Sequence, residues 1–326
     1  MIALVVGFGS VGRKHTSILL DEGFECHIVD PILPNELPPN VVHHYRLEDF
    51  LNLASNQFPA HKDFPIVISN WGPDHTPTLL HLSANGFRRF IVEKPVASRI
   101  VDIDSVNRLV WAGDHQIWCN YHLRFDSGLA EMLAFSKGAG FGDVSLFVLS
   151  GGAKCLSTTG IHWLDFFLNE QSTEIVHVNG DFSNDAKNPR SQDLVYLSGF
   201  LYLRLQDSSK FVMSFTNHSY SSDIIQIYWR NHRATIIGGF ISIFENEAER
   251  ELPLTRTNNF GKVVFEGRIK GDGMLNLHRK FQEDRACMDK LTRANLVLLS
   301  ALKESASNNS EVINDESVDS HDWRIS

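Results

Sequence analysis

The chain has 326 residues, of which 43% are hydrophobic and 21% charged, and its formal net charge is −9. This length and composition predict a globular protein with two domains. The acidic balance argues against nucleic acids and anionic membrane surfaces as partners, because both require a basic protein face. No run approaches the roughly 18 apolar residues needed to cross a bilayer, so no membrane span is predicted.

The cysteines and the first residues favour a cytoplasmic protein. Cys26, Cys119, Cys155 and Cys287 are widely spaced, with neither a C-x-x-C pair nor a zinc-finger cluster, as is typical of reducing compartments. The apolar start Met1–Val6 runs directly into glycines and lacks the basic segment of a signal peptide. We expect this start to form a β-strand.

Short apolar runs alternate with helical periodicity over the first 120 residues. The runs predict strands at Ile2–Val6, His27–Val29, Ile66–Ser69, Phe90–Val92 and Gln116–Cys119. The periodicity predicts helices at Val11–Glu22, Thr76–Ala84 and Ile103–Ala112, and the prolines of Pro31–Pro39 predict a loop. Apolar strands separated by helices are typical of a parallel sheet covered on both faces, so residues 1–120 are predicted to form an α/β domain.

The pattern changes after about residue 121, and residues 121–326 are predicted to form an α+β domain. Strands are predicted at Val144–Leu149, Leu194–Leu205, Lys210–Asn217, Ile224–Trp229 and Arg233–Ile237. Helices are predicted at Ser127–Lys137 and, as one or two segments, within Gln282–Lys303. Period-two alternation in these strands favours a large, mostly antiparallel sheet. The polar stretch Glu304–Ser320 is expected to be a partly mobile surface segment.

The segment Gly7–Gly12 places the pattern G-x-G-x-x-G between the first strand and the first helix. In this arrangement Gly7 permits a tight turn, Gly9 lets the backbone approach a pyrophosphate, and Gly12 lets the helix pack closely on the strand. The helix N-terminus then offers N–H groups and a partial positive charge to the phosphates. A dinucleotide is therefore expected to contact the turn, including its remaining residues Phe8, Ser10 and Val11.

Asp30 ends the second predicted strand and follows the glycine turn at the spacing expected of a dinucleotide site. A carboxylate at this place hydrogen-bonds the hydroxyls of the adenosine ribose and repels a 2′-phosphate. Pro31 follows where an NADP-selective site often has Arg or Lys. These features favour NAD over NADP. The alternative is a glycine turn that only packs, with Asp30 as a solvated strand end.

Further motifs follow the glycine turn in order along the chain. The turn continues through Arg13-Lys14-His15, which gives G-x-G-x-x-G-x-x-H, and the strand at Phe90–Val92 runs into Glu93-Lys94-Pro95. Three later segments also carry matching motifs, namely Ser69–His75, Asn120–Phe125 and Gly160–Asp165. Together these motifs resemble those of the Gfo/Idh/MocA family of NAD(P)-dependent oxidoreductases, which act mainly on sugars, inositols and related polyols. The resemblance covers nearly the whole chain, and Glu-Lys-Pro is its most specific element.

The resemblance implies a fold that agrees with the periodicity. Residues 1–120 would form a Rossmann domain that binds the dinucleotide, and residues 121–326 an α+β domain with an open, mostly antiparallel sheet. In the family, the face of this sheet commonly forms a dimer or tetramer interface. We therefore expect a homodimer or homotetramer that takes a small carbohydrate-type substrate.

The resemblance also implies roles for the best-matched residues. Lys94 would contact both the substrate hydroxyl and the nicotinamide ribose and act in proton transfer, while Glu93 would orient the cofactor or the lysine. His162 would be a substrate-facing acid, base or hydrogen-bond donor, and Asp165, one helical turn later, would support it or bind substrate. The alternatives are a surface lysine at a strand end and a core or capping histidine held by Asp165.

The other matched positions lie around the expected cleft. Asn70, Trp71 and His75 belong to the loop beside the nicotinamide, and Asn120 is expected at the cofactor. His122 and Arg124 lie at the domain crossing, where Arg124 either clamps an anionic group of the substrate or braces the junction through an ion pair. No spacing of His or Cys residues predicts a metal site.

In the loop after the fourth strand, Asn70 and Trp71 replace the usual Thr-Pro of the family, and a further departure bears on the mechanism. Many members carry an Asp four residues before the histidine, whereas this chain has Thr158, flanked by Ser157 and Thr159. The hydroxyls of Thr158 and Thr159 can bind a sugar, but they cannot supply the negative charge that helps a histidine accept a proton. Specificity is expected to reside in loops such as Gly151–Thr159 and Asp181–Gln192.

The leading hypothesis is reversible hydride transfer between NAD(H) and a carbinol or ketone carbon of a sugar, a polyol or a sugar nucleotide. Thr158 motivates an alternative, in which the chain is a non-catalytic NAD-binding regulator or sensor. A third possibility keeps the fold and replaces the carbonyl by an imine or a conjugated double bond.

Overall fold

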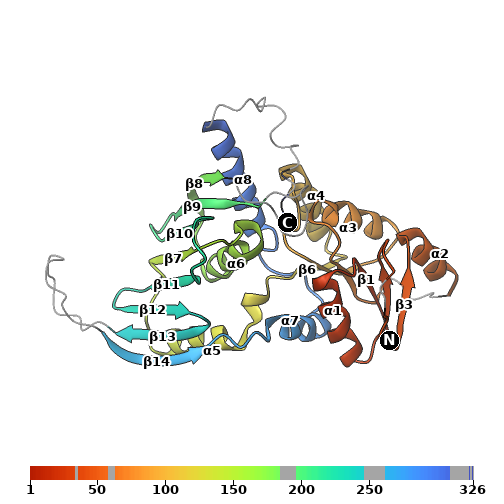
Figure 1. The fold of residues 1–326 in the computed structure, drawn as a ribbon, viewed down its shortest axis with the longest axis horizontal. Helices are drawn as coiled ribbons and strands as arrows, with labels where there is room; N and C mark the ends of the chain where they lie inside the picture. Colours follow the sequence, from red (N-terminus) through yellow and green to blue (C-terminus); the bar gives the residue numbers. More distant parts are fainter. Residues whose placement is uncertain are drawn as a thin grey trace.

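The computed structural model describes residues 1–33, 36–57, 63–183, 196–245, 261–308, 323 and 325. Outside these residues lie positions 34–35 of the proline-rich loop, 184–192 of the second specificity loop, 194–195 of one predicted strand and 309–320 of the polar C-terminal stretch. The described chain forms two sheets that lie side by side, each with its own helices (Figure 1).

The first sheet has six strands in the order β3-β2-β1-β4-β5-β6, and every pairing in it is parallel. Its strands are β1 (Ile2–Val6), β2 (Glu25–Val29), β3 (Val41–His44), β4 (Ile66–Ile68), β5 (Arg89–Val92) and β6 (Gln116–Cys119). Its helices are α1 (Ser10–Asp21), α2 (Leu47–Gln57), α3 (His75–Ala84) and α4 (Ile100–Ala112). The strand order reverses at β1, which places the glycine turn at the crevice where open α/β sheets bind ligands.

The sequence did not predict β3 or α2. Strand β3 lies at the edge of the sheet and pairs only with β2, so it is partly exposed and carries polar side chains in place of an apolar run. By contrast, all residues of β4, β5 and β6 are buried, and these strands were predicted almost to the residue.

The second sheet has eight strands in the order β14-β13-β12-β11-β7-β10-β9-β8 and is mostly antiparallel, as predicted. The exception among its described pairings is the parallel pair of β7 and β10. Its strands are β7 (Leu146–Gly151), β8 (Ile175–Ser183), β9 (Ser198–Leu205), β10 (Lys210–Phe215), β11 (Ile224–Tyr228), β12 (His232–Ile237), β13 (Phe240–Glu245) and β14 (Lys262–Arg268). Strands β8, β13 and β14 were not predicted; β8 and β14 have few buried residues, which weakens their sequence signal.

The helices that follow residue 121 are α5 (Ser127–Gly138), α6 (Ile161–Glu170), α7 (Gly273–Glu283) and α8 (Arg293–Asn308). The prediction of late helices within Gln282–Lys303 is partly wrong, because α7 lies earlier and residues 284–292 are not one of these helices. Helix α8 packs along β8, α6 and α4, and α7 packs against α1, so both late helices contact elements of the first half (Figure 1).

The segment after α7 covers the edge of the first sheet at β6. Met288 donates its backbone N–H to the carbonyl of Ile117 at 3.0 Å, and the indole of Trp118 donates to Ala286 at 2.8 Å. The amide of Gln116 donates to the carbonyl of Phe281 at 2.6 Å. The open edge of a sheet exposes unpaired backbone groups, and this return of the chain satisfies part of them.

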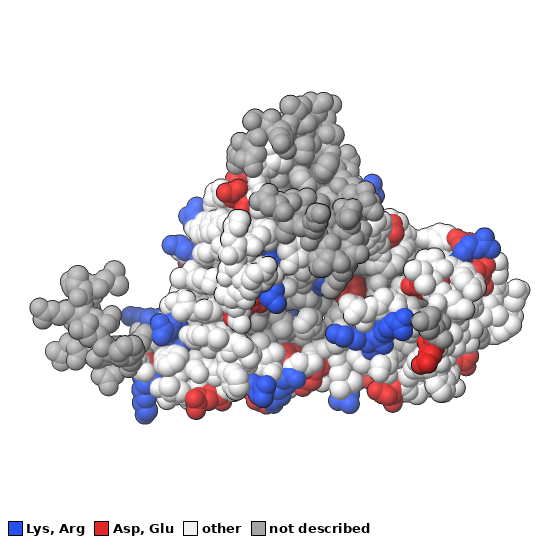
Figure 2. Space-filling model, in the orientation of Figure 1, with Lys and Arg blue, Asp and Glu red and all other residues white. Residues whose placement is uncertain are grey.

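Acidic and basic side chains are interspersed over the visible face of the molecule (Figure 2). Within the described residues, no helix combines the length and apolar character that crossing a membrane would require.

One buried carboxylate joins the start of α5 to the turn between β14 and α7. Asp126 is 1% exposed and caps α5 by accepting the backbone N–H groups of Gly128 at 2.9 Å and Leu129 at 3.1 Å. It also accepts the N–H groups of Lys270 at 3.1 Å and Gly271 at 2.7 Å. A single side chain therefore fixes two segments that are far apart in the sequence.

We predict that Asp126→Ala lowers the free energy of unfolding by about 3 kcal/mol, because it removes a helix cap and two further charge-assisted bonds. Asp126→Asn should lower the free energy of unfolding by less, since its amide oxygen still accepts some of these hydrogen bonds. Asp143→Ala, at an exposed site, is the control, with an expected change within about 0.5 kcal/mol. Urea unfolding measures the free energy of unfolding of the three variants. Equal stability of Asp126→Ala and Asp143→Ala would contradict the prediction.

Candidate active site

The glycine turn has the geometry that dinucleotide binding requires. Gly7 has a φ of +89°, and a Cβ there would lie 2.5 Å from the backbone N of Asn70. A Cβ on Gly12 would lie 2.0 Å from the carbonyl oxygen of Gly7, so the helix packs against the turn as predicted. Gly9 instead faces open space, and no side chain caps α1 there. The first turn of α1 therefore keeps N–H groups that a phosphate can approach.

A groove of about 680 Å³ runs from the glycine turn to Asp30. The carboxylate of Asp30 accepts the backbone N–H of Phe8 at 2.7 Å and that of Ile32 at 2.9 Å, which fixes it at the groove wall. Each oxygen keeps a free lone pair for a hydroxyl. The groove is also lined by Asn70 and Trp71, whereas Phe8 and Ser10 contribute no lining side chain.

Tyr45 and Arg46 line the same groove and were missed by the sequence analysis. They follow β3, whose carboxyl end lies beside that of β2, and the missed strand hid this neighbourhood. The side chain of Arg46 is 76% exposed and forms an ion pair with Asp49 at 3.3 Å.

Glu93 is buried at the end of β5 and connects three other elements. Its Oε1 lies 2.8 Å from Nε2 of His15 on α1 and accepts the amide of Asn120, after β6, at 2.5 Å. Burial by itself raises the pKa of Glu93, but His15, the charge of Lys94 and the bond from Asn120 lower it to about 2. Glu93 is therefore an ionised carboxylate whose position is set by its hydrogen bonds.

The network continues into α7 through a second histidine. Nδ1 of His15 lies 2.7 Å from Nε2 of His278, and both rings are fully buried. Burial and the neighbouring His15 lower the pKa of His278 well below its ordinary value, so this ring is neutral. Because Glu93 can only accept, His15 donates to it from Nε2, and the hydrogen bond between Nδ1 of His15 and Nε2 of His278 extends the network to α7. Neither histidine was predicted from the sequence to have a role.

The backbone after Lys94 is held from two sides. Thr76 donates to the carbonyl of Val96 at 2.8 Å. Asn295 on α8 forms two bonds to Ala97, accepting its N–H at 2.8 Å and donating to its carbonyl at 3.0 Å. Lys94 itself is half-buried. The backbone that follows Lys94 is therefore held by α3 on one side and by α8 on the other.

His75 is not placed as the sequence predicted. It is 2% exposed, and its two ring nitrogens face the carbonyls of Pro95 at 2.7 Å and Asn70 at 3.1 Å. Burial lowers its pKa, so the neutral ring donates to one of these carbonyls at a time. We therefore correct its assignment: His75 joins the loop after β4 to the Lys94-Pro95 segment and is not positioned to contact a nicotinamide.

A cavity of about 370 Å³ brings the predicted catalytic residues together. Side chains from both halves line it: Val11, Glu93, Lys94, Asn120, His122, Thr158, Thr159 and His162 among others. The sequence placed these residues on segments up to 150 positions apart, and the fold joins them at the carboxyl edge of the first sheet.

His162 opens α6 and faces this cavity from a buried position. Its ring centroid lies 4.0 Å from that of His122. Burial, His122 and Lys94 together lower the pKa of His162 well below its ordinary value, so the ring is neutral. Its Nδ1 is buried and has no hydrogen-bond partner among the described residues. Among the described residues no carboxylate is hydrogen-bonded to His162, and Asp165 pairs with Arg124, so the alternative of a histidine held by Asp165 is not observed.

Thr158 and Thr159 reach the cavity from a π-helical turn, η4 (Leu156–Gly160). The hydroxyl of Thr158 lies 3.5 Å from the carbonyl of Cys155, which makes it a weak donor there and leaves it available to a ligand. Among the lining residues of this cavity, Glu93 is the only carboxylate. Thr158 stands where many family members carry an Asp. No other segment of the described lining supplies an acid in its place.

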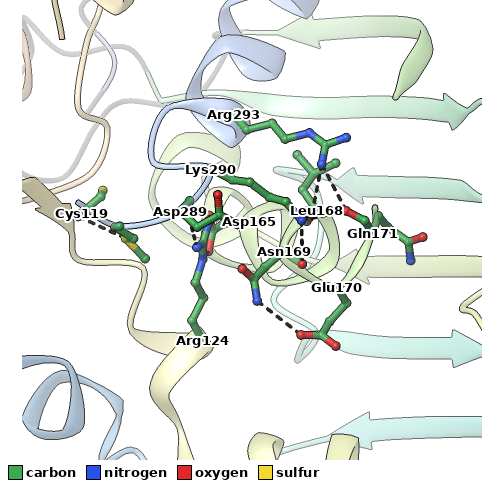
Figure 3. A network of polar contacts seen from close by, with 11 residues as sticks. Cys119, Arg124, Asp165, Leu168, Asn169, Glu170, Gln171, Asp289, Lys290 and Arg293 are labelled. Atoms are coloured by element: carbon green, nitrogen blue, oxygen red, sulfur yellow. Dashed lines mark hydrogen bonds and ion pairs between the residues drawn. The ribbon is translucent and has the colours of Figure 1, made fainter. Parts of the chain in front are cut away.

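Arg124 and Asp165 form a buried ion pair and do not line the cavity. Two bonds of 2.5 Å join the guanidinium to both carboxylate oxygens, and Arg124 also donates to the carbonyl of Asp289 at 2.8 Å (Figure 3). Burial raises the pKa of Asp165 to about 6 although Arg124 lowers it, so the pair is ionised at neutral pH. We correct the expectation that these two residues bind substrate, since the geometry matches the alternative of a brace at the domain crossing.

Two cations hold the other end of α6. Lys290 donates to the carbonyls of Asn169 at 2.9 Å and Gln171 at 2.8 Å (Figure 3). Arg293 donates to the carbonyl of Thr173 at 2.6 Å. Cations suit the C-terminus of a helix, where carbonyls lack intrahelical partners. Helix α6, which carries His162, is thus fixed at both ends by charged side chains.

No group of His, Cys, Asp and Glu side chains in the described parts of the chain is suited to hold a metal ion.

We predict that the free energy of unfolding falls as the pH drops below about 6.5, because the unfolded chain binds protons that the buried histidines exclude. His75, His162 and His278 have lowered pKa values, so their contribution is present above pH 6.5 and is lost below it. Asp165 acts in the opposite direction over part of this range, because its pKa is raised. The comparison of variants is therefore the decisive readout.

Replacement His162→Gln should reduce the dependence of the unfolding free energy on pH, measured by urea unfolding at several pH values. The matched control His81→Gln removes an exposed histidine of α3 and should leave this dependence unchanged. The same pH dependence in both variants would show that His162 is protonated in the folded protein.

No family model and no curated protein matches the sequence. Solved structures do match the fold. UDP-N-acetylglucosamine 3-dehydrogenase GnnA from Acidithiobacillus ferrooxidans aligns with a TM-score of 0.64 at 15% identity, over 94% of this chain and 97% of its own. Myo-inositol 2-dehydrogenase from Lactobacillus plantarum aligns with a TM-score of 0.68 at 13% identity, over 95% and 97%.

A dehydrogenase from Chromobacterium violaceum aligns with a TM-score of 0.70 at 14% identity, over 94% of both chains. At such identities the likeness establishes the fold alone. The neighbours are Gfo/Idh/MocA-type oxidoreductases. The chain therefore has the two-part fold of the Gfo/Idh/MocA-type oxidoreductases, as its motifs predicted.

Proposed function

We propose that the chain is an NAD(P)-dependent oxidoreductase that transfers a hydride between nicotinamide and a carbinol or ketone carbon of a sugar, a polyol or a sugar nucleotide. The observation that carries this proposal is the convergence of Lys94, Asn120 and His162 on one cavity at the sheet edge that also bears the glycine turn. In this proposal residues 1–120 hold the cofactor, residues 121–326 complete the substrate side, and the enzyme is cytoplasmic.

The residues present fit a dinucleotide. The open space at Gly9 would hold the pyrophosphate, and Asp30 would bind the adenosine ribose. The nicotinamide end would enter the cavity that Val11, Lys94 and Asn120 line. Bound there, it would supply or accept the hydride.

The protein's own groups divide the remaining work. Lys94 carries the proton of the substrate hydroxyl, giving it to the oxygen during reduction and taking it during oxidation. His162 is a weak base because its pKa is low, so its part is to hydrogen-bond the substrate oxygen. The hydroxyls of Thr158 and Thr159 orient the sugar in place of the missing carboxylate.

Asp30 favours NAD as the cofactor, because a fixed carboxylate repels a 2′-phosphate. Arg46 is the nearby cation that would favour NADP, but Asp49 partly neutralises it. We therefore propose NAD as the preferred coenzyme.

A second candidate function is a non-catalytic NAD-binding regulator or sensor. One observation favours it: no carboxylate in the described lining of the cavity supports His162, and Glu93 is occupied by His15 and Asn120. The two candidates share cofactor binding and differ in turnover.

We predict that Lys94→Ala lowers kcat by about 100-fold or more, because it removes the proton-transfer group. Reduced nicotinamide is followed spectroscopically with a panel of sugars, polyols and sugar nucleotides, each supplied with NAD and with NADP. The matched control Lys137→Ala changes an exposed lysine of α5, away from the open face of the second sheet, and should retain wild-type kcat and cofactor affinity.

Full activity of Lys94→Ala would reject the lysine assignment. Tight NAD binding by calorimetry, with no turnover on any panel member, would favour the sensor. A higher kcat/KM with NADP than with NAD would overturn the coenzyme preference.

We also propose that the protein is a homodimer or homotetramer formed through the second sheet. Along its central strands, alternate residues such as Phe211 and Met213 are buried, while their neighbours form an open face. This face carries polar side chains such as Gln226 and Thr235, but also large apolar ones: Ile224, Ile237 and Phe240 are 39%, 48% and 63% exposed. Exposed apolar side chains of this size are typical of an interface, and a second copy supplies the same face.

Sedimentation or light scattering should accordingly report a dimer or tetramer. We expect Val212→Asp, in the middle of the open face, to shift the mass toward the monomer, because it buries a charge in the interface. Val101→Asp adds the same charge at an exposed site of α4 and should leave the mass unchanged. A monomeric wild-type protein would disprove the interface.

A further inference from the structure

A second cavity adjoins the candidate active site. It measures about 510 Å³, lies between α1 and α7, and is lined by Lys14, Ser17, Ile18, His122, Met274 and Leu275. Three of these residues, Lys14, His122 and Met274, also line the cavity that contains Lys94 and His162. The two cavities therefore share a wall, and Lys14 lies where they meet.

The first cavity has limited room. At about 370 Å³ it lies near the lower end of ordinary ligand pockets, which span roughly 300–1,000 Å³. In the proposed function it has to hold both the nicotinamide end of the cofactor and the reacting sugar. A substituent on that sugar would extend past His122 and Met274 into the second cavity.

The junction between the cavities is cationic. Lys14 is exposed and forms no ion pair with any described carboxylate. The lining of the second cavity contains no acidic residue, and the single acid of the first, Glu93, is held by His15 and Asn120. An anionic group at the junction would thus meet Lys14 without a competing charge in the described lining.

Beyond Lys14 the second cavity is largely apolar. Ile18 of α1 faces Met274 and Leu275 of α7 across it. Such walls suit a flat, weakly polar ring, and Met adapts its shape to aromatic groups. From Lys94 outward, a bound ligand would therefore contact first polar side chains, then the cation of Lys14, and then an apolar slot.

We propose that Lys14 binds the diphosphate of a nucleoside diphosphate sugar, with the nucleoside in the second cavity and the sugar at Lys94. This inference rests on the proposed function, because the sugar is the part that reacts. Lys14 lies on α1, as does the pyrophosphate-binding turn, but it does not line the groove from Gly9 to Asp30. The anion that it binds is accordingly the substrate's and not the cofactor's.

The test is calorimetric titration of the full-length protein, saturated with NADH, with uridine diphosphate, uridine and glucose 1-phosphate. Uridine diphosphate should bind more tightly than either of the others, because it alone fills the cationic and the apolar part. Lys14→Gln should weaken the binding of uridine diphosphate by about tenfold, equivalent to about 1.4 kcal/mol. The control Lys137→Gln, at an exposed site of α5, should not change this affinity, and neither variant should change the affinity for NADH.

Equal affinity of Lys14→Gln and Lys137→Gln for uridine diphosphate, or no binding of uridine diphosphate to the wild-type protein, would overturn the proposal. Weaker binding of NADH by Lys14→Gln would assign the lysine to the cofactor instead. If glucose 1-phosphate binds as tightly as uridine diphosphate, the placement of the nucleoside in the second cavity is rejected.

Turnover assays separate this inference from the function on which it rests. If neutral sugars are turned over and the binding of uridine diphosphate does not depend on Lys14, the oxidoreductase function is supported and the diphosphate subsite is rejected. Lys14-dependent binding of uridine diphosphate without turnover of any uridine diphosphate sugar would keep the subsite and reject the oxidoreductase.

Discussion

The ionised carboxylate of Glu93 lies in the protein interior, where an unpaired charge would cost several kcal/mol, on the order of a whole domain's stability. Three elements converge to satisfy it: α1 through His15, the end of β6 through Asn120, and α7 through His278 behind His15. Lys94 is the next residue along the chain, so the network that stabilises the carboxylate also locates the proposed proton carrier. The position of Lys94 is therefore a property of both halves of the molecule.

Charged groups fix the substrate side in the same manner. The Arg124–Asp165 pair holds the start of α6 against the domain crossing, while Lys290 and Arg293 bind the carbonyls at its end. The helix itself carries His162, to which no carboxylate of the described residues is hydrogen-bonded. The rigid placement of His162 and its low pKa together suit a neutral hydrogen-bonding group. This arrangement gives a physical account of how the cleft could work without the acid that Thr158 replaces.

Local patterns predicted those parts of the fold that are buried on both faces or locally strained. Strand β4 is apolar throughout, and β5 and β6 are apolar after their first residues, Arg89 and Gln116. The turn at Gly7 and Gly12 admits no Cβ, so both the strands and the turn leave a strong sequence signal. Edge strand β3 has no such signal, and missing it concealed Arg46 in the groove beside Asp30. Lys94, His122, Thr158 and His162 were named from motifs, and the fold brings them into one cavity.

The sequence by itself determined the glycine turn, the parallel sheet, the antiparallel second sheet and the identity of most cavity residues, because each depends on a short stretch of chain. Only the tertiary structure decided which polar groups pair. It assigned Arg124 to Asp165 rather than to substrate, His75 to two backbone carbonyls, and His278 to a network beginning more than 260 residues earlier. The physical reason is that the partner of a buried polar group is selected by proximity after folding, and local periodicity carries no information about that proximity.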